Sequence, residues 1–136
     1  MTGVLVLVAV LVLSTAAGLV HKARSGRFRP ADDSLAPVLA QLGQQPGERA
    51  TLLQFSSAFC APCRATRRVL ADVAGLVPGV RHVEVDAEQH LDVVRRLGIV
   101  KTPTTLVLDA DGRETTRASG APRKADVLAA LGHAVP

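Results

Sequence analysis

The chain has 136 residues and a formal net charge of +4, and 48% of its residues are hydrophobic and 21% charged. This composition is typical of a globular protein, and the length is that of about one domain. Without the apolar run at the N-terminus, roughly a hundred residues remain, which is enough for one hydrophobic core and too few for two. These values exclude a multidomain protein.

The charge balance of the main part of the chain argues against a nucleic-acid partner. Residues 34–136 hold 12 basic and 10 acidic groups, a net charge of +2. The aromatic residues are Phe28, Phe55 and Phe59, which are too few for a base-stacking surface. We therefore expect no binding to nucleic acid.

The N-terminus carries an apolar run over residues 3–20 that contains no charged residue. A helix of this length measures about 27 Å and just spans the hydrocarbon core of a bilayer. We predict a single transmembrane anchor over residues 1–21. Two other interpretations stay open: a signal peptide cleaved near the small residues 14–16, and a helix buried in the domain. A signal peptide is disfavoured because the basic residues follow the apolar run instead of preceding it.

A basic segment over residues 22–33 is predicted to link the anchor to the domain. Its basic residues are Lys22, Arg24, Arg27 and Arg29. Such residues are retained on the cytoplasmic side of a membrane span, so the domain is expected to face the cytoplasm. An extracytoplasmic domain is the alternative.

The rest of the chain predicts an α/β domain over residues 34–136. A first helix carries Leu35, Val38, Leu39 and Leu42 at helical spacing, after N-cap candidates at Asp32, Asp33 and Ser34. The further elements expected, in chain order, are a strand at 50–55, a helix at 61–76, a strand at 80–86, a helix at 89–97, strands at 104–109 and 113–119, and a helix at 124–131. This order predicts a three-layer sandwich, with a mixed, mostly parallel sheet and helices on both faces.

Cys60 and Cys63 are the only cysteines. Two cysteines exclude a disulfide-dense scaffold and cannot by themselves complete a four-ligand zinc site. They lie between an expected strand and an expected helix, where free amide groups and the helix dipole stabilise a thiolate at Cys60. Cys60 is therefore the predicted nucleophile. Cys63, one turn further and deeper, is the predicted resolving thiol, and Pro62 suits the first turn of the helix.

The sequence Phe-Cys-Ala-Pro-Cys at 59–63 and Gly-Ile-Val-Lys-Thr-Pro-Thr at 98–104, with this order of elements, resembles the thioredoxin family over residues 34–133. The resemblance implies a thioredoxin-like fold and a cis peptide at Thr102–Pro103, packed opposite the two cysteines. It also implies that Phe59, Ala61, Pro62, Thr102 and Pro103 bind the substrate chain. From the residues alone, a trans proline at the entrance of a strand is the alternative.

Three residues depart from the family pattern. Phe59 stands where the family usually has Trp and keeps an apolar surface there. Gln54 stands where many thioredoxins have a buried Asp, and it cannot take the proton of the resolving thiol. Glu84 stands where they often have Lys. One hypothesis is that Glu84 transfers this proton through water; the alternative is that it lies on a solvated or hydrogen-bonded side of its strand, with His82 and Asp86.

These observations predict a membrane-tethered thiol–disulfide oxidoreductase that reduces protein disulfides. The chain has no flavin or nucleotide fingerprint, so we expect no cofactor beyond the Cys60–Cys63 disulfide. An external electron donor, such as a thioredoxin reductase or a membrane thiol partner, is then required. The alternative is a non-catalytic binding module, or a copper or zinc carrier that uses both thiols. A metal site is not expected, since the only Met is Met1 and the histidines, His82 among them, are expected to be solvated or capping.

Overall fold

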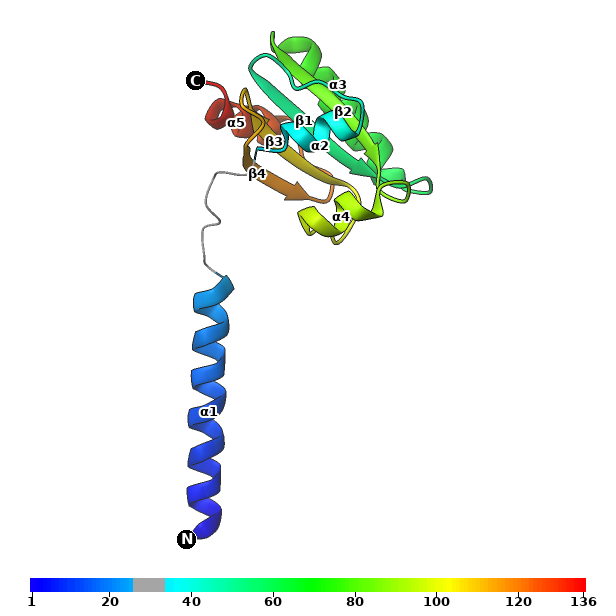
Figure 1. Cartoon of the computed structure of the whole chain (residues 1–136). Helices are drawn as coiled ribbons and strands as arrows, with labels where there is room; N and C mark the ends of the chain where they lie inside the picture. The colour runs from blue at the N-terminus through cyan, green and yellow to red at the C-terminus, as the bar shows by residue number, and fades with distance from the viewer. Residues whose placement is uncertain (26–33) are drawn as a thin grey trace. The chain divides into compact units, whose positions relative to one another are not determined.

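The computed structural model describes residues 1–25 and 34–136. The chain divides into two compact units, residues 1–30 and 31–136. In the first unit, helix α1 (Thr2–Ser25) carries a stretch, Thr2–Val20, whose mean hydropathy is 2.6 (Figure 1). By length and composition this helix could cross a membrane. The bounds of the anchor and of the linker stay predictions, and residues 26–33 of that linker lie outside the described part of the chain.

The second unit contains the helices and strands expected from the sequence, in the expected order (Figure 1). They are α2 (Ala36–Gln41), β1 (Ala50–Ser56), α3 (Ala61–Leu76), β2 (Val80–Asp86), α4 (Leu91–Leu97), β3 (Thr104–Asp109), β4 (Glu114–Ser119) and α5 (Lys124–Ala134). Of the N-cap candidates for α2, Asp32 and Asp33 lie outside the described residues. The N-cap residue of α2 is Leu35, so Ser34 is not the cap; its Oγ accepts a hydrogen bond from the N–H of Ala36, the first residue of the helix, at 3.2 Å.

The four strands form one mixed sheet in the order β2-β1-β3-β4. Strand β1 pairs in parallel with β2, whereas the β1–β3 and β3–β4 pairs are antiparallel. The prediction of a mixed sheet is therefore confirmed, and the prediction that it is mostly parallel is wrong. The connection from β1 through α3 to β2 is a parallel crossover, whereas β3 runs antiparallel to β1.

Helix α4 is too short to return the chain along β2 by itself. A parallel crossover must carry the chain back along the whole preceding strand, and β2 has seven residues, about 23 Å. Helix α4 also has seven residues but rises only about 10 Å. The chain enters β3 at the end of the sheet where β1 and β2 finish, with Thr104 paired to Phe55.

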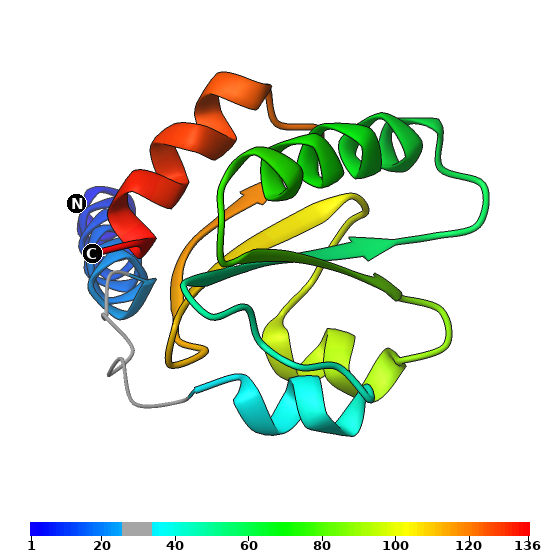
Figure 2. The ribbon, with the colours of Figure 1, turned by 90° about the horizontal axis from the view of Figure 1, so that it is seen from above.

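Helices cover both faces of the sheet, as expected (Figure 2). Helices α2 and α4 lie on one face, where Leu39, Phe55 and Val93 are fully buried in one core cluster. Helices α3 and α5 lie on the other face, where Leu70 and Val73 are fully buried in a second cluster. Because both faces are covered, every residue of β1 is buried, and this strand holds the start of α3 at a fixed place on the sheet.

Candidate active site

Cys60 and Cys63 form a disulfide at the N-terminus of α3. Cys60 is the N-cap residue, its Sγ accepts a hydrogen bond from the N–H of Cys63 at 3.2 Å, and the Cα atoms are 5.2 Å apart. The exposed fraction is 9% for Cys60 and 1% for Cys63. The outer cysteine therefore lies against the free amides of the first helical turn, and the inner one lies behind it.

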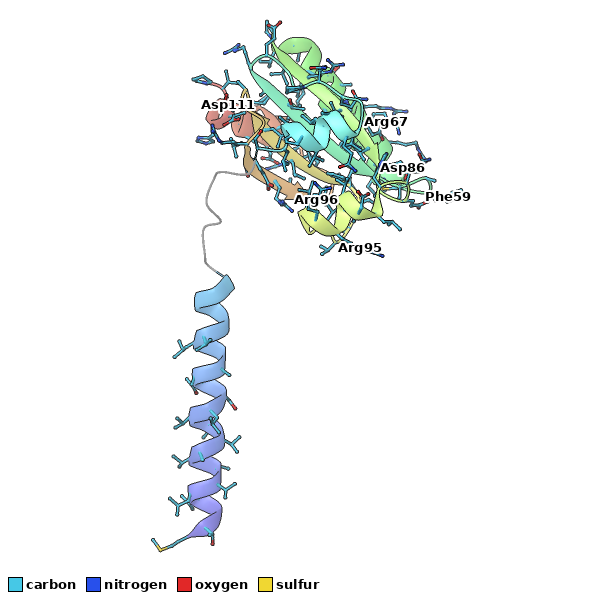
Figure 3. All side chains as sticks on the ribbon, viewed as in Figure 1. Phe59, Arg67, Asp86, Arg95, Arg96 and Asp111 are labelled. Atoms are coloured by element: carbon cyan, nitrogen blue, oxygen red, sulfur yellow. A yellow bond between two sulfur atoms is a disulfide. The ribbon has the colours of Figure 1, made fainter. Side chains whose placement is uncertain are left out.

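The residues expected to bind a substrate chain lie on two segments, the one that carries the disulfide and the one that contains Thr102 and Pro103. Phe59, Ala61 and Pro62 are exposed, and Figure 3 shows Phe59 at the same end of the domain as Asp86. The Thr102–Pro103 peptide is cis, as the resemblance implied. A hydrogen bond of 2.9 Å between the hydroxyls of Ser57 and Thr102 joins the segment before Cys60 to this peptide. The roles of these residues in binding stay predictions.

Gln54 is completely buried on β1 beneath the first turn of α3. Its Nε2 donates hydrogen bonds to the main-chain carbonyl of Cys63 at 3.0 Å and to the Oγ of Ser56 at 2.9 Å. Its Oε1 lies 3.0 Å from Nε2 of His82. The amide thus connects Cys63, in the first turn of α3, to both β1 and β2.

Glu84 lies on the neighbouring strand, opposite Gln54, and forms a bidentate ion pair with Arg67 of α3. The two hydrogen bonds measure 2.5 and 2.7 Å. Partial burial acts to raise the pKa of Glu84, but hydrogen bonds from Arg67 and Ser56 and the charge of Arg67 outweigh it, so this pKa lies below its ordinary value. A carboxylate held in this way is a weak base, as expected if Glu84 lies on a hydrogen-bonded side of its strand.

His82 differs from the expectation of a solvated or capping histidine. It is half-buried and bonded to Gln54, because β2 turns alternate side chains toward α3 and places His82 on the same face as Glu84. Burial lowers the pKa of His82, the negative charge of Glu84 opposes this shift, and the positive charge of Arg67 adds to it. The pKa of His82 therefore lies below its ordinary value, which favours the neutral imidazole.

An open groove of about 420 Å³ runs beside the disulfide between α3 and β2. Its lining includes both cysteines together with Ser56, Arg64, Arg67 and Glu84. Within the described residues, no group of three or more Cys, His, Asp and Glu side chains is placed to hold a metal ion. The groove therefore presents a disulfide flanked by hydroxyl, guanidinium and carboxylate groups.

Two contacts of this site were not predicted from the sequence: the ion pair of Arg67 with Glu84 and the hydrogen bond of His82 with Gln54. Arg67 follows Cys63 by four residues, so helical spacing places both on one side of α3. Strand alternation likewise places His82 beside Glu84. These two periodicities were the available signals, but neither shows which partner each side chain meets.

Comparison with known proteins shows similarity to thioredoxins. A model of the thioredoxin-like domain family matches residues 40–135. Thioredoxin H-type 1 of Nicotiana tabacum is 30% identical over 89 residues, which cover 65% of this chain and 70% of the tobacco protein. Thioredoxin of Mycobacterium bovis is 30% identical over 86 residues, covering 62% of this chain and 73% of that protein.

Solved structures show the same likeness. The crystal structure of thioredoxin NaTrxh from Nicotiana alata matches with a TM-score of 0.59 at 24% identity, covering 65% of this chain and 76% of that one. Thioredoxin F from spinach chloroplast matches with a TM-score of 0.59 at 21% identity, covering 75% and 87%. At these identities the likeness shows the fold.

Proposed function

Because the chain belongs to the thioredoxin-like family, we propose that it is a membrane-tethered thiol–disulfide oxidoreductase that reduces disulfide bonds of protein substrates. The observation that carries the proposal is the cysteine pair at the start of α3, where the outer sulfur accepts an amide hydrogen bond and the inner one is almost completely buried. This asymmetry separates an attacking sulfur from a resolving one.

The reaction proceeds in two exchanges. The thiolate of Cys60 attacks one sulfur of the substrate disulfide, forms a mixed disulfide and releases the first substrate thiolate. The thiolate of Cys63 then attacks Sγ of Cys60 and releases the second one. Two electrons pass from the dithiol to the substrate, and the Cys60–Cys63 disulfide is left behind. An external donor, such as a thioredoxin reductase or a membrane thiol partner, returns two electrons and two protons.

The start of α3 supplies what the first exchange needs. The N–H of Cys63 and the positive end of the helix dipole both stabilise negative charge on Cys60 Sγ. Arg64 lines the same groove and adds positive charge, whereas the charge of Arg67 is largely offset by Glu84. The electrostatic environment of Cys60 therefore favours a thiolate.

In the proposed complex, an extended segment of the substrate lies against the two segments beside the disulfide. Phe59 supplies apolar contact area, since its side chain is 101% exposed. Ala61 and Pro62 leave the approach to Cys60 free of large side chains, and the main chain of Thr102, next to Pro103, hydrogen-bonds the substrate backbone.

The tether is helix α1, and the domain is proposed to face the cytoplasm. The apolar side chains over residues 4–20 of α1 are exposed, and a bilayer would cover them. The basic residues that follow, Lys22, Arg24, Arg27 and Arg29, support a cytoplasmic domain. A cytoplasmic location favours the reductase direction, because the thiol pool there is kept reduced.

Turnover of a protein disulfide by the full chain in detergent micelles tests the proposal. We expect Cys60→Ser to abolish reduction and Cys63→Ser to stop after one exchange, with the substrate trapped on Cys60. Mass spectrometry under non-reducing conditions detects the trapped species. Turnover that survives in Cys60→Ser would refute the mechanism, and a metal complex that resists glutathione, without turnover, would favour the carrier.

A further inference from the structure

The buried amide of Gln54 has a defined orientation. Its nitrogen faces the main-chain carbonyl of Cys63, which can only accept a hydrogen bond, so this group must be the NH₂ end. Oε1 then faces His82, and Nε2 of His82 carries the proton that Oε1 accepts. Every polar atom of the amide is bonded, in a side chain with no exposed surface.

These contacts fix the main chain of Cys63 on both sides. Its N–H lies within hydrogen-bonding distance of the carbonyl oxygen of Cys60, at 3.1 Å, and of the Cys60 sulfur, at 3.2 Å. Its carbonyl accepts from Gln54 at 3.0 Å. With the backbone held in this way, the position of the Cys63 sulfur relative to Cys60 depends mainly on one side-chain rotation.

We infer that Gln54 is a positioning residue for the resolving cysteine, holding Cys63 so that its thiolate can attack the sulfur of Cys60 while a substrate is attached. The inference rests on the proposed function and concerns its second exchange alone. Gln54 neither gains nor loses a proton, so it acts through geometry, which raises the effective concentration of the attacking thiolate. The titratable and charged groups nearest the amide are His82 and Glu84 of β2 and Cys63 and Arg67 of α3, and the groove beside it is also lined by Arg64 and Asp86.

The two exchanges can be measured separately with the reduced full chain in detergent micelles and a limiting amount of 5,5′-dithiobis(2-nitrobenzoate). Cys60 releases the first aryl thiolate at a rate proportional to the reagent concentration. Cys63 releases the second at a rate independent of it. In Gln54→Leu we expect the first rate to stay within about twofold and the second to fall on the order of tenfold or more.

Gln54→Glu distinguishes positioning from proton transfer and keeps the shape of the side chain. Its protonated form can still donate to the Cys63 carbonyl, whereas its ionised form cannot donate but could accept the Cys63 proton. Positioning predicts that, relative to wild type, the second rate falls as the new acid ionises with rising pH. A second rate that rises above wild type as the acid ionises would overturn the inference.

Thr51→Val is the matched control, because it removes a buried hydroxyl on the same strand that accepts from the N–H of Gly47 at 2.9 Å. We expect its second rate to equal that of wild type. An equal slowing in Thr51→Val and Gln54→Leu would assign the effect to lost stability and overturn the inference, as would an unchanged second rate in Gln54→Leu. A wild-type chain that releases no second thiolate would instead refute the proposed function.

Discussion

At the scale of single residues, two polar side chains of the site could be considered as acceptors for the proton of the Cys63 thiol. Gln54 is buried and cannot titrate, and Glu84 is bound by two hydrogen bonds from Arg67. Neither is a strong base near neutral pH, because an amide has no titratable proton and an ion pair lowers the pKa of a carboxylate. We therefore expect Cys63 to lose its proton to the solution and to react through its position.

Glu84→Gln is expected to leave the rate of mixed-disulfide resolution unchanged from about pH 6 to about pH 9. The reason is the lowered pKa of Glu84, which makes it a poor acceptor for a thiol proton. The lost ion pair is partly exposed, so we expect the free energy of unfolding to fall by less than about 1 kcal/mol. The rate is measured with the aryl disulfide reagent. Slower resolution in the variant, regained at high pH, would show that Glu84 does accept the proton.

His82 should make the stability of the fold depend on pH. Burial lowers its pKa in the folded state, so near its ordinary pKa the unfolded chain binds the proton more readily. The contribution of neutral His82 to the free energy of unfolding is therefore complete above the pKa that His82 has in the unfolded chain. It is lost as the pH falls through the lower pKa that His82 has in the folded chain. We expect wild type to lose more free energy of unfolding than His82→Gln between about pH 7.5 and about pH 5.5, in urea titrations. Parallel curves for the two proteins would contradict this.

At the scale of elements, the connection into β1 is tightly packed. A Cβ added to Gly47 would lie 2.9 Å from both the nitrogen of Arg81 and the carbonyl oxygen of Gly79, and closer still to the carbonyl oxygen of Ala50. All three are main-chain atoms: Ala50 and Arg81 lie in the paired strands β1 and β2, and Gly79 directly precedes β2. These atoms cannot move without disturbing the sheet. Only glycine fits here without a shift.

Gly47→Ala should therefore destabilise the domain by about 2 kcal/mol or more, because the clash involves backbone. Gly132→Ala is the matched control: it lies in α5, and an added Cβ would have no neighbour within 4 Å. There we expect a gain of up to about 1 kcal/mol from helix propensity. Denaturant unfolding of both variants measures the difference, and equal effects would refute the packing argument.

At the scale of the whole molecule, one apolar helix and one thioredoxin-like domain share the chain. A tether restricts the dithiol to a membrane surface, so substrates held at the same surface are met at a raised effective concentration. The proposed cytoplasmic side would make cellular thiol reductants available as electron donors. A cytoplasmic side would therefore favour the reductase direction of the proposed reaction.

Because Cys60 and Cys63 are the only thiols, a membrane-impermeant maleimide reports the side of the membrane. After treatment of cells with an impermeant reductant, we expect labelling only once the cells are lysed, with the labelled chain in the membrane fraction at its full length. Labelling of intact cells would place the domain outside the cytoplasm. A shortened chain in the soluble fraction would instead indicate a cleaved signal peptide.

The sequence by itself determined the order of helices and strands, the Cys60–Cys63 pair at the start of a helix and the apolar segment near the N-terminus. These features depend on local periodicity and spacing, which the chain displays directly. Only the tertiary structure decided that β3 runs antiparallel to β1 and that Gln54 holds the Cys63 carbonyl. Such contacts join residues far apart in the sequence, and which partners meet depends on helix length, strand register and the packing of both faces.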